Sequence, residues 1–194
     1  MICWALNMRN LDRIVDITTD AFQHDPFNTW VFETRANMHR LFEREARSVY
    51  GKHGQVDLIE NDAAMMWMPK GQSHDMPLMT GLGFVASLCV RGQFGALQRA
   101  FSTADGFAKA FPEEPVTYLF TIAVRPEAQG KGRGGQLMRR FVDACDADGS
   151  AGWLESTNPG NRGFYQSFGF HVREVLHVTN DAPPVDLMYR EARL

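Results

Sequence analysis

A glycine-rich basic loop joins an apolar strand to a helix, and this arrangement constrains the fold more than any other part of the chain. Residues 118–124 are mostly β-branched and aromatic, which is typical of a buried strand. After the loop, apolar residues recur at helical spacing and predict a helix over 134–148. The loop therefore lies at a helix N-terminus, where free N–H groups and the helix dipole favour an anion.

Several loop residues favour a ligand with two linked phosphates. Glycines lack the side chains that would block close approach to the backbone. The loop glycines are Gly130, Gly132, Gly134 and Gly135. Lys131 and Arg133 add positive charge between them.

A dinucleotide site is the first alternative. Gly130, Gly132 and Gly135 fit the fingerprint G-x-G-x-x-G, and Glu155 follows twenty residues later. In that motif the first glycine follows the strand almost directly, whereas residues 125–129 intervene here. The short remainder after Glu155 also lacks room for further βαβ units. A phosphate loop with Lys before Ser or Thr is excluded because Gly132 follows the lysine.

Two linked motifs instead resemble the GNAT superfamily of N-acetyltransferases. Gln129-x-x-Gly132-x-Gly134, after a strand that ends Val-Arg-Pro, resembles the family's acyl-coenzyme A signature. Residues 153–170 resemble its next strand and short helix, with Asn161 and Tyr165 in the expected places. Weaker similarities near residues 22–30 and 64–71 extend the resemblance to the puromycin N-acetyltransferase-like branch. Puromycin itself does not follow as the substrate.

The resemblance implies an α/β (α+β) fold with a GNAT-like mixed, mostly antiparallel central sheet, flanked by helices and splayed at the cofactor strand. It implies acetyl-CoA (coenzyme A) as the cofactor. The main chain of Ile122, Ala123 and Val124 would bind the pantetheine arm and the thioester oxygen. The pyrophosphate would rest on the backbone N–H groups of Gln129, Gly130, Lys131, Gly132, Arg133, Gly134 and Gly135. The remaining expected cofactor contacts are Asn158, Asn161, Phe164 and Tyr165.

Tyr165 is the candidate general acid that protonates the departing thiolate. Asn161 is a good N-cap and Gly169 a good residue after a helix, so a helix of about two turns is expected between them. Phe164 and Phe168 would share its core face, and Tyr165, about 100° away from Phe164, would face the cleft. A tyrosine that only packs on the pantetheine is the simpler interpretation.

The general base is less clear from the sequence. An aliphatic amine with a pKa near 10.4 is only about 0.1% neutral at pH 7.4, so proton removal needs assistance. Glu155, expected on the strand beside the cofactor strand, is the first candidate. Glu33, Asp25 and His24 follow, and a chain of water molecules to bulk solvent is another alternative.

Length and composition favour a single N-acetyltransferase domain over 1–194. No linker divides the 194 residues. The net charge of −3 gives no global attraction to nucleic acid or an anionic membrane, so neither is expected as a partner. Cys3, Cys89 and Cys145 form no C-x-x-C pair, and the histidines have no ligand spacing, so no metal is predicted. Cys145 is expected in the core. The apolar opening is too short for a signal peptide, and no run spans a bilayer, which favours a cytoplasmic protein.

The remaining sequence predicts further elements. They are a strand over 2–8, a helix capped by Asn10 and stopped by Asp25-Pro26, a helix over 37–49, a hairpin of 56–60 and 63–68, one or two helices over 78–111, and closing strands over 171–179 and 185–189. Residues 78–111 either line the acceptor pocket or complete the core. Trp30 and Trp67 offer aromatic surface to an acceptor, although Trp67 lies in an apolar strand that favours a core role.

The sequence therefore predicts an acetyl-CoA-dependent N-acetyltransferase that transfers acetyl directly to a primary amine of a small molecule or peptide. The alternative is a noncatalytic acyl-CoA-binding sensor or regulatory module. No motif specifies the acceptor or the acyl chain length. The protein is expected to be a monomer or homodimer.

Overall fold

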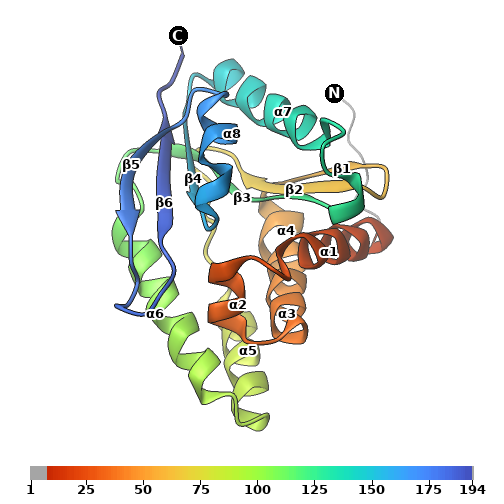
Figure 1. Ribbon diagram of the computed structural model, residues 1–194, viewed down its shortest axis with the longest axis vertical. Helices are drawn as coiled ribbons and strands as arrows, with labels where there is room; N and C mark the ends of the chain where they lie inside the picture. Colours follow the sequence, from red (N-terminus) through yellow and green to blue (C-terminus); the bar gives the residue numbers. More distant parts are fainter. Residues whose placement is uncertain (1–7, 194) are drawn as a thin grey trace.

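The computed structural model describes residues 8–193, which form a six-stranded sheet with helices on both faces (Figure 1). The strands are β1 (Gln55–Ile59), β2 (Ala63–Met68), β3 (Val116–Val124), β4 (Ala151–Ser156), β5 (His171–Leu176) and β6 (Val185–Arg190). Their order in the sheet is β1-β2-β3-β4-β6-β5. β3 and β4 run parallel, and the other neighbouring strands pair antiparallel. This confirms the predicted mixed, mostly antiparallel fold.

Helices from the N-terminal half lie on one face of the sheet, and two C-terminal helices lie on the other (Figure 1). The helices are α1 (Met8–Phe22), α2 (Pro26–Phe32), α3 (Arg35–Glu45), α4 (Gly51–His53), α5 (Leu78–Val90), α6 (Phe94–Ala110), α7 (Arg133–Asp148) and α8 (Arg162–Gln166). Shorter turns are the π-helical η1 (Ala46–Tyr50) and the 3₁₀ turns η2 (Pro126–Ala128) and η3 (Pro159–Asn161). None of the helices within residues 8–193 is long and apolar enough to cross a membrane.

The sheet separates two apolar layers because successive residues of a strand point to opposite faces. Tyr118 of β3 packs in the layer under α1 and α3 with Phe42, whereas its neighbour Leu119 packs under α7 with Phe141. Cys145 of α7 is fully buried, as predicted, and burial raises the pKa of its thiol to about 11. This cysteine is therefore a core residue rather than a nucleophile.

Most predicted elements are confirmed, including the hairpin, the strand before the glycine loop, the helix after it and the two closing strands. Residues 78–111 form two helices. The helix predicted over 37–49 is present but passes into the π-helical turn at Ala46.

At the N-terminal end one prediction fails, one is confirmed but incomplete, and a third cannot be compared. Asn10 lies inside α1, which begins at Met8, so it is not the N-cap. Asp25-Pro26 does more than end a helix, because Asp25 accepts a hydrogen bond from the Asn28 N–H and Pro26 begins α2. Proline is favoured at this position because a first-turn N–H has no helical partner to lose. The predicted strand over 2–8 lies outside the described residues, apart from Met8.

Candidate active site

The glycine loop lies at the N-terminus of α7, as predicted. Gly130 and Gly132 both have φ of 75°, a left-handed conformation that glycine adopts without steric cost. A Cβ built at either position would meet no heavy atom within 4 Å. The loop therefore presents open backbone at the end of a 16-residue helix, which suits a phosphate group.

The side chains around this loop hold its shape. Gln129 donates from Nε2 to the Val124 carbonyl at 3.3 Å and so links the loop to the end of β3. Lys131 is exposed, whereas the Arg133 guanidinium turns toward the β1–β2 turn and pairs with Glu60 and Asp62. The positive side-chain charge next to the glycines therefore comes from Lys131 and from Arg139, whose Nη2 lies 3.7 Å from a Cβ built at Gly135.

The β3 strand separates from β4 in its second half. The parallel pairing ends at Leu119, which faces Leu154, so residues 120–124 have no partner on β4. At the same point the register with β2 shifts, because Trp67 pairs with Leu119 and Met66 with Thr121. Phe120 is the extra residue of this bulge, and bulges bend a strand and redirect its side chains.

This divergence fits the predicted acyl donor. Ile122, Ala123 and Val124 pair with β2 on one edge, and their other edge faces the gap that opens beside β4. Exposed strand edges bind extended ligands through main-chain hydrogen bonds. Ile122 also lines the cavity, and Val124 lies beside the glycine loop, with its Cγ2 3.5 Å from a Cβ built at Gly134. An elongated molecule with a pyrophosphate at one end and a thioester at the other matches this path.

Helix α8 packs beside the start of α7 through aromatic rings. Phe164 lies against Gly134, since a Cβ built there would be 3.7 Å from Cζ of Phe164. Phe164 also contacts Tyr165 and Phe168, with ring centroids 5.2 and 5.3 Å away. Phe164 therefore lies next to the first turn of α7, near the glycine loop where it was predicted.

Tyr165 points into the cavity from α8 and is buried. Burial, aided by the negative charge of Asp25, raises the pKa of its hydroxyl well above its ordinary value. The phenol therefore keeps its proton at neutral pH, as a general acid must before it acts.

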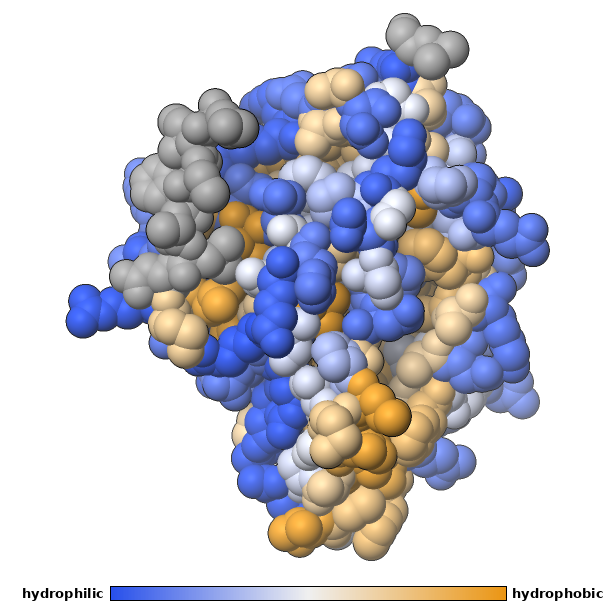
Figure 2. All heavy atoms as spheres, turned by 180° about the vertical axis from the view of Figure 1, so that it is seen from behind, coloured by the Kyte–Doolittle hydropathy of each residue, from blue (hydrophilic) through white to orange (hydrophobic). Residues whose placement is uncertain are grey.

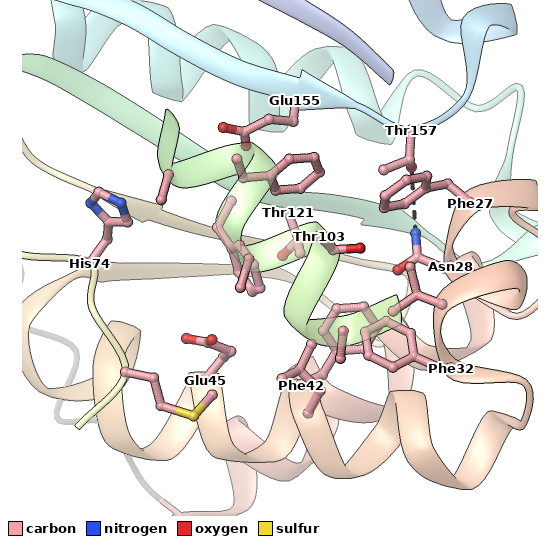
Figure 3. Close-up of a pocket in the computed structure, with 18 of the residues that line it drawn as sticks. Phe27, Asn28, Phe32, Phe42, Glu45, His74, Thr103, Thr121, Glu155 and Thr157 are labelled. Atoms are coloured by element: carbon pink, nitrogen blue, oxygen red, sulfur yellow. Dashed lines mark hydrogen bonds between the residues drawn. The ribbon is translucent and has the colours of Figure 1, made fainter. Parts of the chain in front are cut away.

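A polar cluster lies between Tyr165 and α2. The buried Asp25 accepts hydrogen bonds from the backbone and side chain of Asn28, both at 2.8 Å, and from Thr157 Oγ1 at 2.9 Å. Figure 3 shows Asn28 reaching toward Thr157, which follows β4. These contacts fix the end of β4 relative to α2. Asp25 is thus occupied as a helix cap, although the sequence also suggested it as a base.

Glu155, the first-choice base, lines the same cavity from β4. The Trp153 indole donates to its Oε1 at 2.7 Å, and Tyr118 also donates a hydrogen bond to it. Burial outweighs these bonds and raises the pKa of Glu155 to about 7. A carboxyl with this pKa changes protonation state near neutral pH, which suits a general base.

The other suggested groups lie elsewhere. Glu33 pairs with Arg99 at 2.9 Å and His24 is exposed, and neither lines the cavity. Trp67 packs edge-on against Phe141 under α7, so its core role is confirmed. Trp30 stacks beneath Arg99 and donates to Asp181.

The two asparagines differ from their predicted roles in detail. The Asn158 side chain accepts from the Gly160 N–H at 2.9 Å and so caps the short turn η3. Asn161 precedes α8 without a side-chain capping bond, because its helical backbone turns the side chain away from the helix end. Asn161 therefore occupies the predicted N-cap position, but its side chain makes no capping hydrogen bond. Its exposed side chain lies at the cavity, and Gly169 has the expected left-handed φ of 89°.

A large apolar cavity occupies the space between the sheet and α2, α3, α5 and α6. Its volume is about 660 Å³, within the range of small-molecule sites. Tyr165 and Glu155 lie at its sheet side, and helices α5 and α6 form the opposite wall. Residues 78–111 therefore line a cavity and also contribute Phe84 and Leu88 to the core, and an acceptor role for this cavity stays a prediction.

Several polar groups in this cavity were not found from the sequence. The side-chain oxygens of Thr103, Thr121 and Glu45 (Oε2) are buried without a hydrogen-bond partner among the described residues. His74 also lines the cavity and stacks on Phe111 with centroids 4.4 Å apart. Within residues 8–193, no group of three or more His, Cys, Asp or Glu residues could hold a metal ion.

Part of the chain is similar to known acetyltransferases. Residues 92–172 match the model of the Acetyltransferase (GNAT) domain. An uncharacterised N-acetyltransferase of Schizosaccharomyces pombe is 34% identical over 76 residues, which cover 38% of this chain and 31% of that protein. The alignment thus spans about a third of the curated relative. Both matches cover less than half of this chain.

Solved structures with low sequence identity share the fold. Histone acetyltransferase HPA2 and related acetyltransferase from Corynebacterium glutamicum is 20% identical with a TM-score of 0.68, and 97% of this chain and 94% of that chain are covered. The ribosomal-protein-S18-alanine N-acetyltransferase of Escherichia coli is 17% identical with a TM-score of 0.55, and the coverage is 97% and 92%. The chain therefore has a GNAT-like fold, and residues 92–172 are similar to the GNAT acetyltransferase domain.

Proposed function

We propose that this protein is an acetyl-CoA-dependent N-acetyltransferase, a single domain that transfers acetyl directly to a primary amine of a small molecule or peptide. One observation carries the proposal. Tyr165 and Glu155 line the same cavity as Ile122, at the place where β3 diverges from β4. A proton donor and a proton acceptor thus lie beside the predicted thioester site.

The chain's own residues have distinct tasks in this proposal. The backbone N–H groups of residues 129–135 bind the pyrophosphate, and the free edge of β3 orients the pantetheine arm. Acetyl-CoA supplies the activated acyl group. Glu155 removes a proton from the incoming ammonium, and Tyr165 gives a proton to the departing thiolate sulfur. The apolar cavity excludes water, which strengthens both interactions.

The pKa values of Glu155 and Tyr165 agree with these roles. Glu155, with its pKa raised to about 7, is increasingly ionised above neutral pH and can then accept a proton. Tyr165 has a pKa above its ordinary value and remains neutral over the same range. Two groups in one cavity therefore provide an acid and a base at the same pH.

The test is a thiol-release assay with acetyl-CoA across a panel of amines, with mass spectrometry of the products. We expect amine-dependent thiol release and an acetylated amine. Tight acetyl-CoA binding without turnover on any amine would instead indicate the noncatalytic sensor. Membership of the puromycin N-acetyltransferase-like branch, the cytoplasmic location and a monomeric or homodimeric state stay predictions.

A further inference from the structure

The helical wall of the cavity is suited to an apolar molecule. Helices α5 and α6 contribute aliphatic and aromatic side chains to it, and α2 and α3 add further phenylalanines. These lining residues include Leu82, Phe84, Leu97, Phe101, Phe107 and Phe42. Apolar walls of this size bury most of a small ligand and stabilise it in proportion to its apolar area.

The charged groups of the cavity are all acidic. Among the described residues that line it, none is Lys or Arg, whereas Glu45, Asp75 and Glu155 carry carboxyl groups. His74 is the remaining group that can carry positive charge, and burial lowers its pKa, which favours the neutral ring. The cavity therefore favours cationic ligands and has no partner for a carboxylate or a phosphate.

Glu45 is the carboxyl without an assigned task. It is the last residue of α3, and the π-helical turn η1 follows it directly. Its Oε2 is buried and has no hydrogen-bond partner among the described residues. A buried polar atom without a partner is costly, and such atoms cluster where a ligand completes the bonding.

Glu45 and Glu155 approach the cavity from opposite sides. Figure 3 shows Glu155 on the strand side and Glu45 on the helix below it, with Thr121 and Thr103 between them. Both carboxyls influence the Tyr50 and Tyr118 hydroxyls electrostatically, so they share one region of low dielectric constant. Glu155 is placed to receive the proton of the reacting amine. A second cation would find its counter-charge at Glu45.

We propose that the acceptor is a predominantly apolar small molecule with two cationic groups, and that Glu45 binds the group that is not acetylated. This inference rests on the proposed function, since Glu155 and Tyr165 define the end where the reacting amine lies. The apolar walls hold the part between the two groups. Glu45 is then a specificity-determining residue, and the chemical class is an aliphatic or arylalkyl diamine.

Binding of such a cation should also release a proton from Glu45. Burial raises the pKa of Glu45 to about 8, so the free carboxyl is mostly protonated at neutral pH. A cation stabilises the ionised form, so Glu45 releases a proton when the diamine binds. The groups that face it from other elements, Glu155, Tyr50 and Tyr118, are acidic or neutral and offer no competing cation.

The test compares three kinds of amine at each chain length from butyl to dodecyl. They are the n-alkylamine, the α,ω-diamine and the ω-amino acid, which differ only in the terminal group. Thiol release with acetyl-CoA gives kcat/KM for each. We expect the diamine to exceed the alkylamine by about tenfold or more at the best length, the usual scale for a charged hydrogen bond, and the amino acid to react least.

Glu45→Gln isolates the role of this carboxyl. It should lower kcat/KM for the diamine by about tenfold while leaving the alkylamine within about twofold, because only the diamine has a second charge. Glu43→Gln is the matched control, since it makes the same change two residues earlier on α3, at a side chain that pairs with Arg47 and does not line the cavity, and it should affect all three amines little. Acetyl-CoA affinity verifies that each variant is folded.

Two outcomes separate this inference from the proposed function. If amines are acetylated but the wild-type protein does not prefer diamines at any length, or if Glu45→Gln affects alkylamine and diamine equally, the role of Glu45 is overturned. If no amine releases thiol, the proposed function fails. Calorimetry of the diamine series in buffers of different ionisation enthalpy then provides a readout without turnover, and absence of Glu45-dependent proton release with every diamine would contradict the inference.

Discussion

The two sides of the cavity differ in how they would contact a ligand. On the cofactor side, the glycine loop and the free edge of β3 offer backbone groups. On the acceptor side, α5 and α6 offer apolar side chains, and Glu45 offers a carboxyl. Backbone contacts require particular conformations and leave glycines at fixed spacing. Side-chain contacts leave only an apolar pattern, which a hydrophobic core produces as well.

This difference explains which parts of the site could be predicted from the sequence. The strand, loop and helix around Gly132 were predicted because each left a local signal. The bulge at Phe120, where β3 separates from β4, left none, since it depends on pairing with β2. Residues 78–111 showed helical spacing, but no periodicity distinguishes a cavity wall from a core face.

Glu45 did leave a signal that was overlooked. It lies four residues after Leu41 and three after Phe42, on the apolar face of α3. A charged residue at such a position is rare unless it is paired or functional. For Asn161 the residue type predicted too much. Asparagine favours a capping hydrogen bond, but Asn161 has a helical backbone conformation and makes no such bond.

Gly132→Asp should have the largest effect of these substitutions, since it changes the glycine loop on the cofactor side. A carboxylate beside the pyrophosphate would repel it and weaken acetyl-CoA binding by about 100-fold or more, measured by calorimetry. Gly149→Asp is the matched control, because Gly149 lies at the other end of α7 with a left-handed φ of 57° and open space around it. Equal losses in both variants would mean that the loop does not bind the phosphates.

Tyr165→Phe tests the residue that is expected to act between the cofactor side and the acceptor side of the cavity. Loss of the hydroxyl should lower kcat by about 10²- to 10⁴-fold and leave acetyl-CoA affinity unchanged, as expected when a general acid is removed. Tyr189→Phe, away from the cavity, should behave like the wild type. Full turnover by Tyr165→Phe across the pH range would exclude Tyr165 from the chemistry.

Glu155→Gln should lower kcat/KM by about 100-fold. It should also abolish the rise of kcat/KM with pH that we expect for the wild type. The raised pKa means that Glu155 is protonated below about pH 7 and active as a base above it, so wild-type kcat/KM should rise through that value. The measurement is a pH profile with a saturating acyl donor. A profile that keeps the same rise in the variant would assign it to another group.

Glu45→Gln should also change the stability of the fold, in a way that depends on pH. A carboxyl with an ordinary pKa of 4.5 and a folded pKa of about 8 destabilises the fold progressively as pH rises between those values. The neutral amide lacks this penalty, so the variant should melt higher by about 10 °C at pH 8 and close to the wild type at pH 4. Melting curves at both pH values test this. A lower melting temperature at pH 8 would show that Glu45 has a stabilising partner.

The most direct test of the central claim is titration calorimetry of the purified protein with acetyl-CoA, with NADH as the control. The glycine loop and the free edge of β3 together predict that acetyl-CoA binds with one site per chain and that NADH does not bind. Binding of NADH alone would contradict the account, because the loop would then hold a dinucleotide and the cavity would not be an acetyl-transfer site.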